Sequence, residues 1–329
     1  MFNFEDKTIL ITGASGFVGS SMVFHLMKFK KIKIIALSKN KENLSRIFAK
    51  YKNHKNLTLI AQDIAKPFYN LKNNIDYIFH AASPQEAKTI KKTPLDVIFP
   101  NILGTINCLN FLKKNKKKTR LVFFSSVTVY GNNTNTNLKL NETNTAVTEA
   151  INSENAPYSE SKRMSEVIIN SYIKQFKVDA VICRLSTVYG PTHYKKNNAF
   201  SEFINNVILG RDIYVKSSTL PKRDNIYVDD AISGLFCVAL KGKKGETYNI
   251  SSNGELGNFL SVSEIAKLIT KIHNDNFSKF SRKIKLKLKK IKYIKKYGIR
   301  LNNSKLKKLG WCLTTGISEG IKKTINFYL

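Results

Sequence analysis

Three evenly spaced glycines stand near the start of the chain, between a short apolar run and an apolar helical pattern. Residues 8–12 read Thr-Ile-Leu-Ile-Thr, and Gly13, Gly16 and Gly19 follow at once. Glycine triplets also occur in ordinary turns, but a strand before and a helix after are the setting that brings backbone N–H groups to a pyrophosphate. The pattern predicts a dinucleotide-binding turn. Its expected contacts are Gly13, Ser15, Gly16, Phe17, Val18 and Gly19.

Apolar runs alternate with helical patterns through the first half, as in a parallel sheet wrapped by helices. Strands are expected at residues 8–12, 33–37, 57–62, 77–81, 120–125 and 180–185, and helices are expected to begin near Gly16, Glu42, Asn101, Ser159 and Phe200. The Asn- and Thr-rich residues 132–155 predict a surface loop over the site.

The elements become shorter and less regular after Gly190 and Pro191. We therefore expect an α/β protein: a Rossmann-type doubly wound parallel sheet with a smaller C-terminal substrate-binding lobe. The dinucleotide-binding domain would take residues 1–185 with a returning segment at about 226–251, and the lobe would take residues 186–329.

The end of the second expected strand bears on which dinucleotide binds. An acidic side chain there would bond the ribose hydroxyls and repel a 2′-phosphate. This chain has Ser38 and Lys39 instead, with Arg46 further along. A hydroxyl followed by basic groups favours NADP over NAD by charge complementarity. NAD stays open, because lysines are abundant everywhere in the chain.

A tyrosine and a lysine four residues apart form the candidate catalytic pair. Tyr158 and Lys162 fall on one face of an expected helix. A phenol with a pKa near ~10 is a weak acid or base at neutral pH, and a nearby ammonium lowers that pKa by favouring the phenolate. Ser126, at the end of an expected strand, supplies the hydroxyl that would complete a catalytic set of three.

The formal net charge of +32 can indicate an anionic partner, namely nucleic acid, an acidic membrane surface or a phosphate-bearing ligand, or it can reflect coding bias. Of 55 basic residues 47 are Lys, and a bias toward AT-rich codons explains much of that excess, so nucleic acid is not the expected partner. Residues 279–296 form one basic run. A solvated, Lys-protected edge strand is the favoured interpretation of this run, although its apolar residues also fit a helical stripe. Contact with phosphates or an acidic membrane is the alternative function.

The four cysteines are scattered, with no Cys-x-x-Cys pair: Cys108, Cys183, Cys237 and Cys312. That spacing argues against a structural metal site and fits a reducing compartment. A strand-like run begins by Lys7, which leaves no room for a signal peptide, and no apolar stretch approaches the roughly 18 residues of a membrane span. We expect a cytoplasmic protein that binds no metal.

Taken together, these motifs resemble the extended short-chain dehydrogenase/reductases, and in particular the NAD-dependent epimerase/dehydratase family. The resemblance covers nearly the whole chain. It implies the catalytic residues Ser126, Tyr158 and Lys162 and a homodimer built through the Tyr/Lys helix. It adds the cofactor contacts Asp63, Ile64, Ala81, Ala82, Asn101, Leu185 and Val188. It also implies substrate contacts at Ser83, Ser126, Thr187, Arg223 and Arg300, with Arg223 facing the phosphates of a nucleotide-sugar substrate.

Departures from the family pattern narrow the expected reaction. Sugar-nucleotide 4,6-dehydratases follow the catalytic Ser/Thr with Asp-Glu, whereas this chain has Val127 and Thr128, which cannot ionise. UDP-glucuronate decarboxylases carry a Glu at the position of Thr128. The remaining pattern resembles UDP-glucose 4-epimerases. Thr187 replaces an Asn that contacts substrate phosphate in the family, which leaves an NADPH-dependent ketoreductase of a keto sugar or another activated carbonyl compound as the alternative. A catalytically idle relative that binds RNA or a partner is the third hypothesis.

Overall fold

The computed structural model describes residues 2–68, 71, 74–115, 118–131, 139–144, 150–193, 198–215, 221–288 and 298–329. Seven parallel strands form the main sheet, in the spatial order β11-β7-β5-β4-β1-β2-β3. The direction of winding reverses between β1 and β4, and ligands of doubly wound sheets bind at the carboxyl ends of the strands at such a point. The strands are β1 (Lys7–Thr12), β2 (Ile32–Ser38), β3 (Leu57–Ala61), β4 (Tyr77–His80), β5 (Arg120–Ser126), β7 (Asp179–Leu185) and β11 (Thr247–Ile250).

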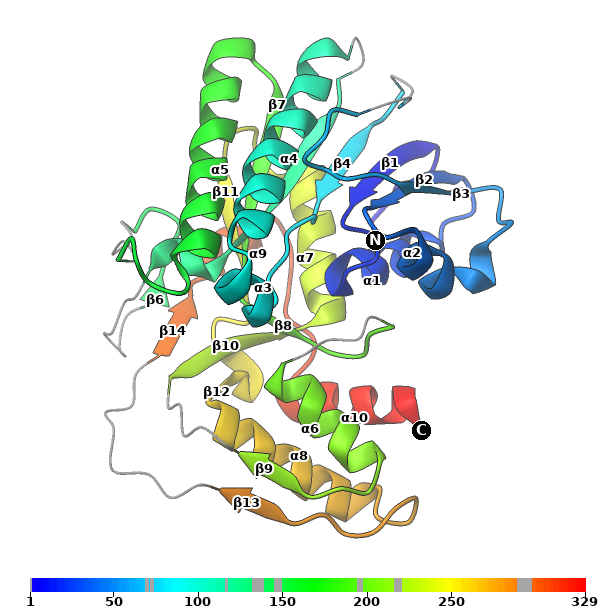
Figure 1. Cartoon of the computed structure of the whole chain (residues 1–329), viewed down its shortest axis with the longest axis vertical. Helices are drawn as coiled ribbons and strands as arrows, with labels where there is room; N and C mark the ends of the chain where they lie inside the picture. Colours follow the sequence, from blue (N-terminus) through cyan, green and yellow to red (C-terminus); the bar gives the residue numbers. More distant parts are fainter. Residues whose placement is uncertain are drawn as a thin grey trace.

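Helices cover both faces of this sheet (Figure 1). Because side chains alternate along a strand, Ile9 and Ile11 of β1 pack in the core with α1 (Phe17–Leu26) and α7 (Val228–Lys241). Leu10 packs in the opposite core with α4 (Leu95–Lys114) and α5 (Ala156–Phe176). The short helices α2 (Lys41–Ile47), η1 (Ala49–Tyr51) and α3 (Ala87–Lys92) lie in the connections.

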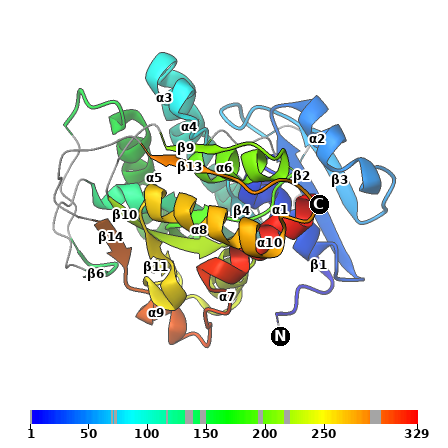
Figure 2. The same cartoon turned by 90° about the horizontal axis from the view of Figure 1, so that it is seen from below.

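A smaller lobe lies beyond the carboxyl ends of the strands and is built on short strands (Figure 1). β10 (Lys222–Tyr227) pairs with β8 (Thr187–Tyr189), β12 (Phe259–Leu260) and β14 (Gly298–Leu301), and β14 also pairs with β6 (Lys139–Leu140). β9 (Ile213–Val215) and β13 (Leu286–Leu288) form a separate pair. Seen from below, α8 and α10 cross this lobe (Figure 2). Its helices are α6 (Ala199–Ile208), η3 (Glu255–Gly257), α8 (Val262–Asn276), α9 (Ser304–Lys307) and α10 (Ile317–Tyr328).

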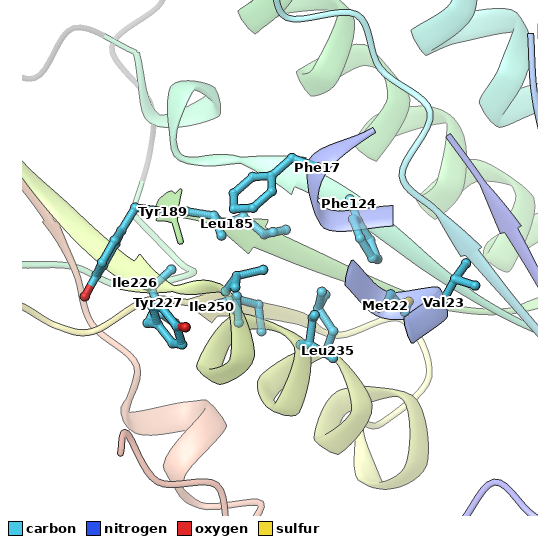
Figure 3. Close-up of a cluster of buried hydrophobic side chains, with 14 of the residues drawn as sticks. Phe17, Met22, Val23, Phe124, Leu185, Tyr189, Ile226, Tyr227, Leu235 and Ile250 are labelled. Atoms are coloured by element: carbon cyan, nitrogen blue, oxygen red, sulfur yellow. The ribbon is translucent and has the colours of Figure 1, made fainter. Parts of the chain in front are cut away.

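One hydrophobic core joins the main sheet to the lobe. Tyr189 and Tyr227, at the ends of β8 and β10, belong to the same buried cluster as Met22 of α1 and Leu235 of α7. Figure 3 shows Tyr189 and Tyr227 near the start of α7 and Leu235 and Met22 farther along it, with Phe17 and Leu185 above. The start of α1, directly after the glycine turn, therefore packs in the same core as the strands that lead into the lobe.

The sheet and its helices confirm the expected fold class, and the six expected strands agree with β1–β5 and β7 to within one residue at most boundaries. The helix expected at Asn101 begins six residues earlier, at Leu95, and continues through Pro100. This α4 is long and apolar enough to cross a membrane by length and composition, which corrects the expectation that no stretch approaches that length. α4 packs on the sheet and on α5, and helices that pack in a protein core can be equally long and apolar.

Two low-complexity segments are only partly described. Within residues 132–155, residues 132–138 and 145–149 lie outside the described residues, and β6 adds a strand to the sheet of the lobe where a loop was expected. Within residues 279–296, residues 289–296 lie outside the described residues. β13 there is a strand, as the edge-strand interpretation predicted, and not part of a helix.

Candidate active site

The glycine turn joins β1 to α1 and lies against the end of β4. Gly13 has φ of +68°, which favours glycine, and a Cβ built on it would lie 2.7 Å from the backbone of Ala82. A Cβ on Gly19 would lie 2.4 Å from the carbonyl oxygen of Gly13, so only glycine lets α1 pack this close to the turn. Gly16 is the N-cap of α1 and makes no side-chain cap.

These features fit the diphosphate of a dinucleotide. The start of α1 has neither a side-chain cap nor an acidic residue in its first turn, so its positive end is not neutralised locally. Ser15 is buried next to the turn, and Val18 is half-buried beside Phe17. Ala81 and Ala82 continue β4 on the other side, where the N–H of Ala82 donates to Thr12 Oγ1 at 3.3 Å. Thr12 in turn bonds the ring of the buried His80 at 2.7 Å.

At the end of β2 the predicted adenosine contacts come together in two pairs. The hydroxyls of Ser15 and Ser38 lie 2.6 Å apart, and the Lys39 ammonium lies 2.9 Å from the Asp63 carboxylate. The bond to Asp63 raises the pKa of Lys39, whose side chain is 78% exposed. Ile64 packs below against Gly104 of α4.

The Tyr/Lys pair lies in the first two turns of α5. Lys162 is buried and its Nζ donates to the carbonyl oxygen of Phe124 at 2.7 Å. Burial lowers the pKa of Lys162 to about 7, against the opposing charge of Glu166. Tyr158 is half-buried, and its pKa is raised by burial and lowered in part by the hydroxyls of Ser126 and Ser83. The expected depression of the Tyr158 pKa by Lys162 is wrong for the protein alone, because the lysine is directed to Phe124 and its own charge is weakened by burial.

Ser126 ends β5 beside this pair. Thr128, in the turn η2 (Val127–Tyr130), donates to Ser126 Oγ from its backbone N–H at 3.2 Å and from its hydroxyl at 3.1 Å. Ser126 is therefore held in place as an acceptor by its own turn. Ser83 Oγ is buried near Tyr158, so the hydroxyls of Ser83, Ser126 and Tyr158 lie together.

A buried ion pair beneath α5 was missed by the sequence argument. Arg184 of β7 donates from Nε and Nη2 to both oxygens of Glu166, at 3.0 and 2.7 Å, and Ser125 Oγ donates to the same carboxylate at 2.5 Å. Glu166 follows Lys162 by one helical turn, so the spacing alone could have predicted that Glu166 shares a face of α5 with Tyr158 and Lys162. A lone Arg in the apolar residues 180–185 was the other available signal.

Asn101 ties α4 to this helix. Its Nδ2 donates to Ser161 Oγ at 2.8 Å, and its Oδ1 is buried without a hydrogen-bond partner among the described residues. Leu185 and Val188 belong to the core cluster that also contains Phe17, the first residue of α1. No group of three or more His, Cys, Asp or Glu among the described residues could hold a metal ion.

The predicted substrate residues are separated by strand register. Arg223 pairs with Ile299, and Ile299 packs against the buried cluster that contains Val129 and Tyr130 of η2. Since alternate residues face opposite sides, Arg300 points to the other face, where its guanidinium lies 5.0 Å from the ring of Phe259. Register also places Thr187 opposite Asn225, on the same face as Arg223. The structure therefore groups Arg223 and Thr187 and leaves Arg300 apart.

Known proteins resemble this chain over nearly its full length. A dTDP-D-glucose 4,6-dehydratase of Dictyostelium discoideum is 29% identical, covering 98% of this chain and 81% of its own. Two solved structures share the fold at 22% identity. They are a UDP-glucose 4-epimerase of Thermotoga maritima with UDP-glucose (TM-score 0.76; 98% of both chains) and the enzyme WbmF of Bordetella bronchiseptica with NAD+ (TM-score 0.75; 98% and 92%).

The sequence profile described as the NAD dependent epimerase/dehydratase family matches residues 9–251, from β1 through β11. That span contains the glycine turn, Ser126, the Tyr158/Lys162 pair and Arg223. The chain is thus an enzyme of the extended short-chain dehydrogenase/reductase type and belongs to the NAD-dependent epimerase/dehydratase family of nucleotide-sugar metabolism.

Proposed function

We propose that this enzyme is a nucleotide-sugar epimerase acting at C4. The observation that carries the proposal is the side-chain set around Ser126: a Tyr/Lys pair on α5, a threonine-oriented serine, and no carboxyl group at positions 127 and 128. Dehydration across C5 and C6 needs a group that removes the C5 proton, and neither Val127 nor Thr128 can ionise. Epimerisation needs only that one hydroxyl lose and regain its proton while a hydride leaves and returns.

The chain's own residues would act as follows. Arg223 binds the diphosphate, and the C4 hydroxyl lies between Tyr158 and Ser126. Tyr158 takes the proton of that hydroxyl, while Ser126 donates a hydrogen bond to the same oxygen and is held by Thr128. Lys162 positions the phenol and ribose. The bound nicotinamide dinucleotide supplies the hydride acceptor and donor at C4. Tyr158 then returns the proton to the oxygen of the inverted carbon.

The test is proton NMR of UDP-glucose and UDP-N-acetylglucosamine incubated with the purified protein and no added cofactor. The proposal predicts appearance of the C4 epimer, with no net change in absorbance at the wavelength of reduced nicotinamide. Loss of the anomeric signals to a 4-keto-6-deoxy product would instead assign dehydratase chemistry.

An NADPH-dependent ketoreductase is the second candidate, and Thr187 favours it because it shares a face with Arg223 where the family has an amide side chain. Such an enzyme would be purified without cofactor and would consume one NADPH for each product molecule. Tightly held dinucleotide with no net consumption would remove this candidate.

We further propose NADP as the preferred dinucleotide. Ser38 and the exposed ammonium of Lys39 lie at the end of β2, where a 2′-phosphate would be bound. The Bordetella enzyme of the same fold was solved with NAD+, so mass spectrometry of the nucleotide released from denatured protein should be compared with standards of both.

We also propose a homodimer formed through α4 and α5. Leu95, Phe99 and Leu103 form an exposed stripe at spacing i, i+4, i+8 on α4, and Met164 and Val167 are exposed on the neighbouring α5. A second copy covering this stripe also explains why α4 is apolar enough to resemble a membrane span. Sedimentation velocity should give a dimer that Phe99→Glu dissociates, whereas Ile151→Glu, at a 97% exposed site, should not.

We propose a cytoplasmic location, because all four cysteines are free in the structure and three of them are buried.

A further inference from the structure

The end of the smaller lobe farthest from the main sheet is a two-stranded edge (Figure 1). β9 and β13 pair in parallel, with Tyr214 opposite Lys287, whose ammonium donates to the tyrosine hydroxyl at 3.1 Å. Beside them Arg282 binds Asp212 at 2.8 Å. Residues 209–215 and 279–288 therefore form one continuous surface, the β9/β13 edge.

This edge is strongly cationic. The carboxylate of Asp212 is its only acidic group, and that carboxylate accepts hydrogen bonds from Arg282 and from the backbone N–H of Lys285, at 2.8 and 3.0 Å. The charges of the remaining exposed basic side chains are therefore not compensated within the edge. The exposed basic residues are Arg211, Lys279, Arg282, Lys283, Lys285 and Lys287.

Large apolar side chains protrude among these cations. Phe280 is 61% exposed, Leu209 52% and Tyr214 50%. Leu288 is opposite the buried Val215 and so faces the other side of the strand pair. A solvated edge protected by lysines alone would have no reason to expose three such groups in two short segments. Amines beside protruding aromatic and aliphatic groups match the interface of an anionic bilayer, where the cations meet the head groups and the apolar tips enter the acyl boundary. Leucine does not stack on nucleic-acid bases, so this mixture fits lipid better than RNA.

We propose that the β9/β13 edge docks the enzyme on the surface of a bilayer containing anionic phospholipid. The basic side chains give the attraction to head groups, and Phe280 and Leu209 give the part of the binding that salt does not screen. This surface shares no residue with the site around Ser126, so the proposal stands independently of the reaction assigned above.

The test is co-sedimentation of the full-length protein with vesicles of phosphatidylcholine, with and without about 30% phosphatidylglycerol. Binding is expected to the anionic vesicles only. Reversing three edge charges, with Lys279→Glu, Lys283→Glu and Lys285→Glu, should weaken that binding by roughly 30-fold or more. Phe280→Ser should weaken it by about tenfold at every salt concentration. Phe280 is mostly exposed, so this variant is expected to fold normally.

The matched control reverses three exposed lysines near η1, with Lys50→Glu, Lys52→Glu and Lys55→Glu. It changes the net charge equally and should leave vesicle binding within about threefold. Equal loss in both triple variants would overturn the proposal, because the attraction would then come from the overall charge. Full binding by Phe280→Ser, or binding of an RNA oligonucleotide through the edge without vesicle binding, would overturn it as well.

Discussion

Two lysines at opposite ends of the proposed dinucleotide site differ in burial and have pKa values shifted in opposite directions. Lys162, on the catalytic side, is buried among α5, β5 and the ring of Phe123, and burial lowers its pKa to about 7. Lys39, on the adenosine side, is 78% exposed, and the bond to Asp63 raises its pKa. Burial makes the first charge sensitive to small changes nearby, whereas solvent screens the second. The catalytic side should therefore give large effects on mutation, and the adenosine side small ones.

Tyr158→Phe should cause the largest effect. Removing one hydroxyl takes away the proposed acid and base, so kcat should fall by about 10²–10⁴-fold with little change in cofactor binding. Tyr172→Phe is the control, because Tyr172 lies on the same helix and its hydroxyl bonds Asn110 at 2.9 Å, away from the site. Steady-state epimerisation assays would measure both. Full activity of the first variant would remove Tyr158 from the mechanism.

Glu166→Gln tests whether the catalytic side depends on its buried ion pair. Glu166 and Arg184 are 10% and 15% exposed, and breaking one partner of such a pair costs about 3–5 kcal/mol. Urea unfolding should reveal that loss. Glu160→Gln, three residues from Arg163 on the same helix and 40% exposed, should cost less than about 0.5 kcal/mol. Equal costs would mean that burial does not distinguish the two pairs.

The lowered pKa of Lys162 predicts a pH dependence of stability. Between about pH 7 and the ordinary lysine pKa of 10.5, the unfolded chain binds this proton and the folded chain does not. The free energy of unfolding should therefore gain a positive contribution as pH rises through that window. Lys162→Met should remove this contribution, seen as a shallower rise in urea midpoints. Parallel curves for the two proteins would show that Lys162 titrates normally.

Lys39→Ala should have the smallest effect. Its ammonium is exposed and already paired with Asp63, so the dissociation constant for NADP+ should rise only about threefold to tenfold, and that for NAD+ less. Lys41→Ala, at an exposed position at the start of α2, is the control. Calorimetric titration of cofactor-free protein measures each constant. A loss as large for NAD+ as for NADP+ would place Lys39 away from the 2′-phosphate.

Features set by neighbouring residues could be predicted from the sequence, whereas contacts between distant elements could not. The glycine turn and the strands of the main sheet follow from local patterns, since each apolar run is bounded by its own turn residues. The partners of Glu166 could not be read in this way, because Arg184 and Ser125 come from two other elements and meet it only after the sheet has formed. The helix expected to begin at Asn101 in fact begins at Leu95 and continues through Pro100.

Strand register also limited what the sequence could predict about the substrate residues. Arg223 and Arg300 are both basic residues of the expected substrate lobe, yet pairing of Arg223 with Ile299 sends them to opposite faces. A shift of one residue would have reversed this outcome, and period alone cannot fix such a shift between distant strands. The substrate site is therefore harder to predict from sequence than the cofactor turn, because the turn depends on adjacent residues only.

The most direct test uses a UDP-sugar deuterated at C4. If the dinucleotide takes the C4 hydrogen and returns it to the same carbon, NMR should find that wild-type protein forms the C4 epimer with its deuterium still at C4. Tyr158→Phe should form almost no epimer. Deuterium at C6 of a deoxy product, or released into solution on a reduced dinucleotide, would contradict the account.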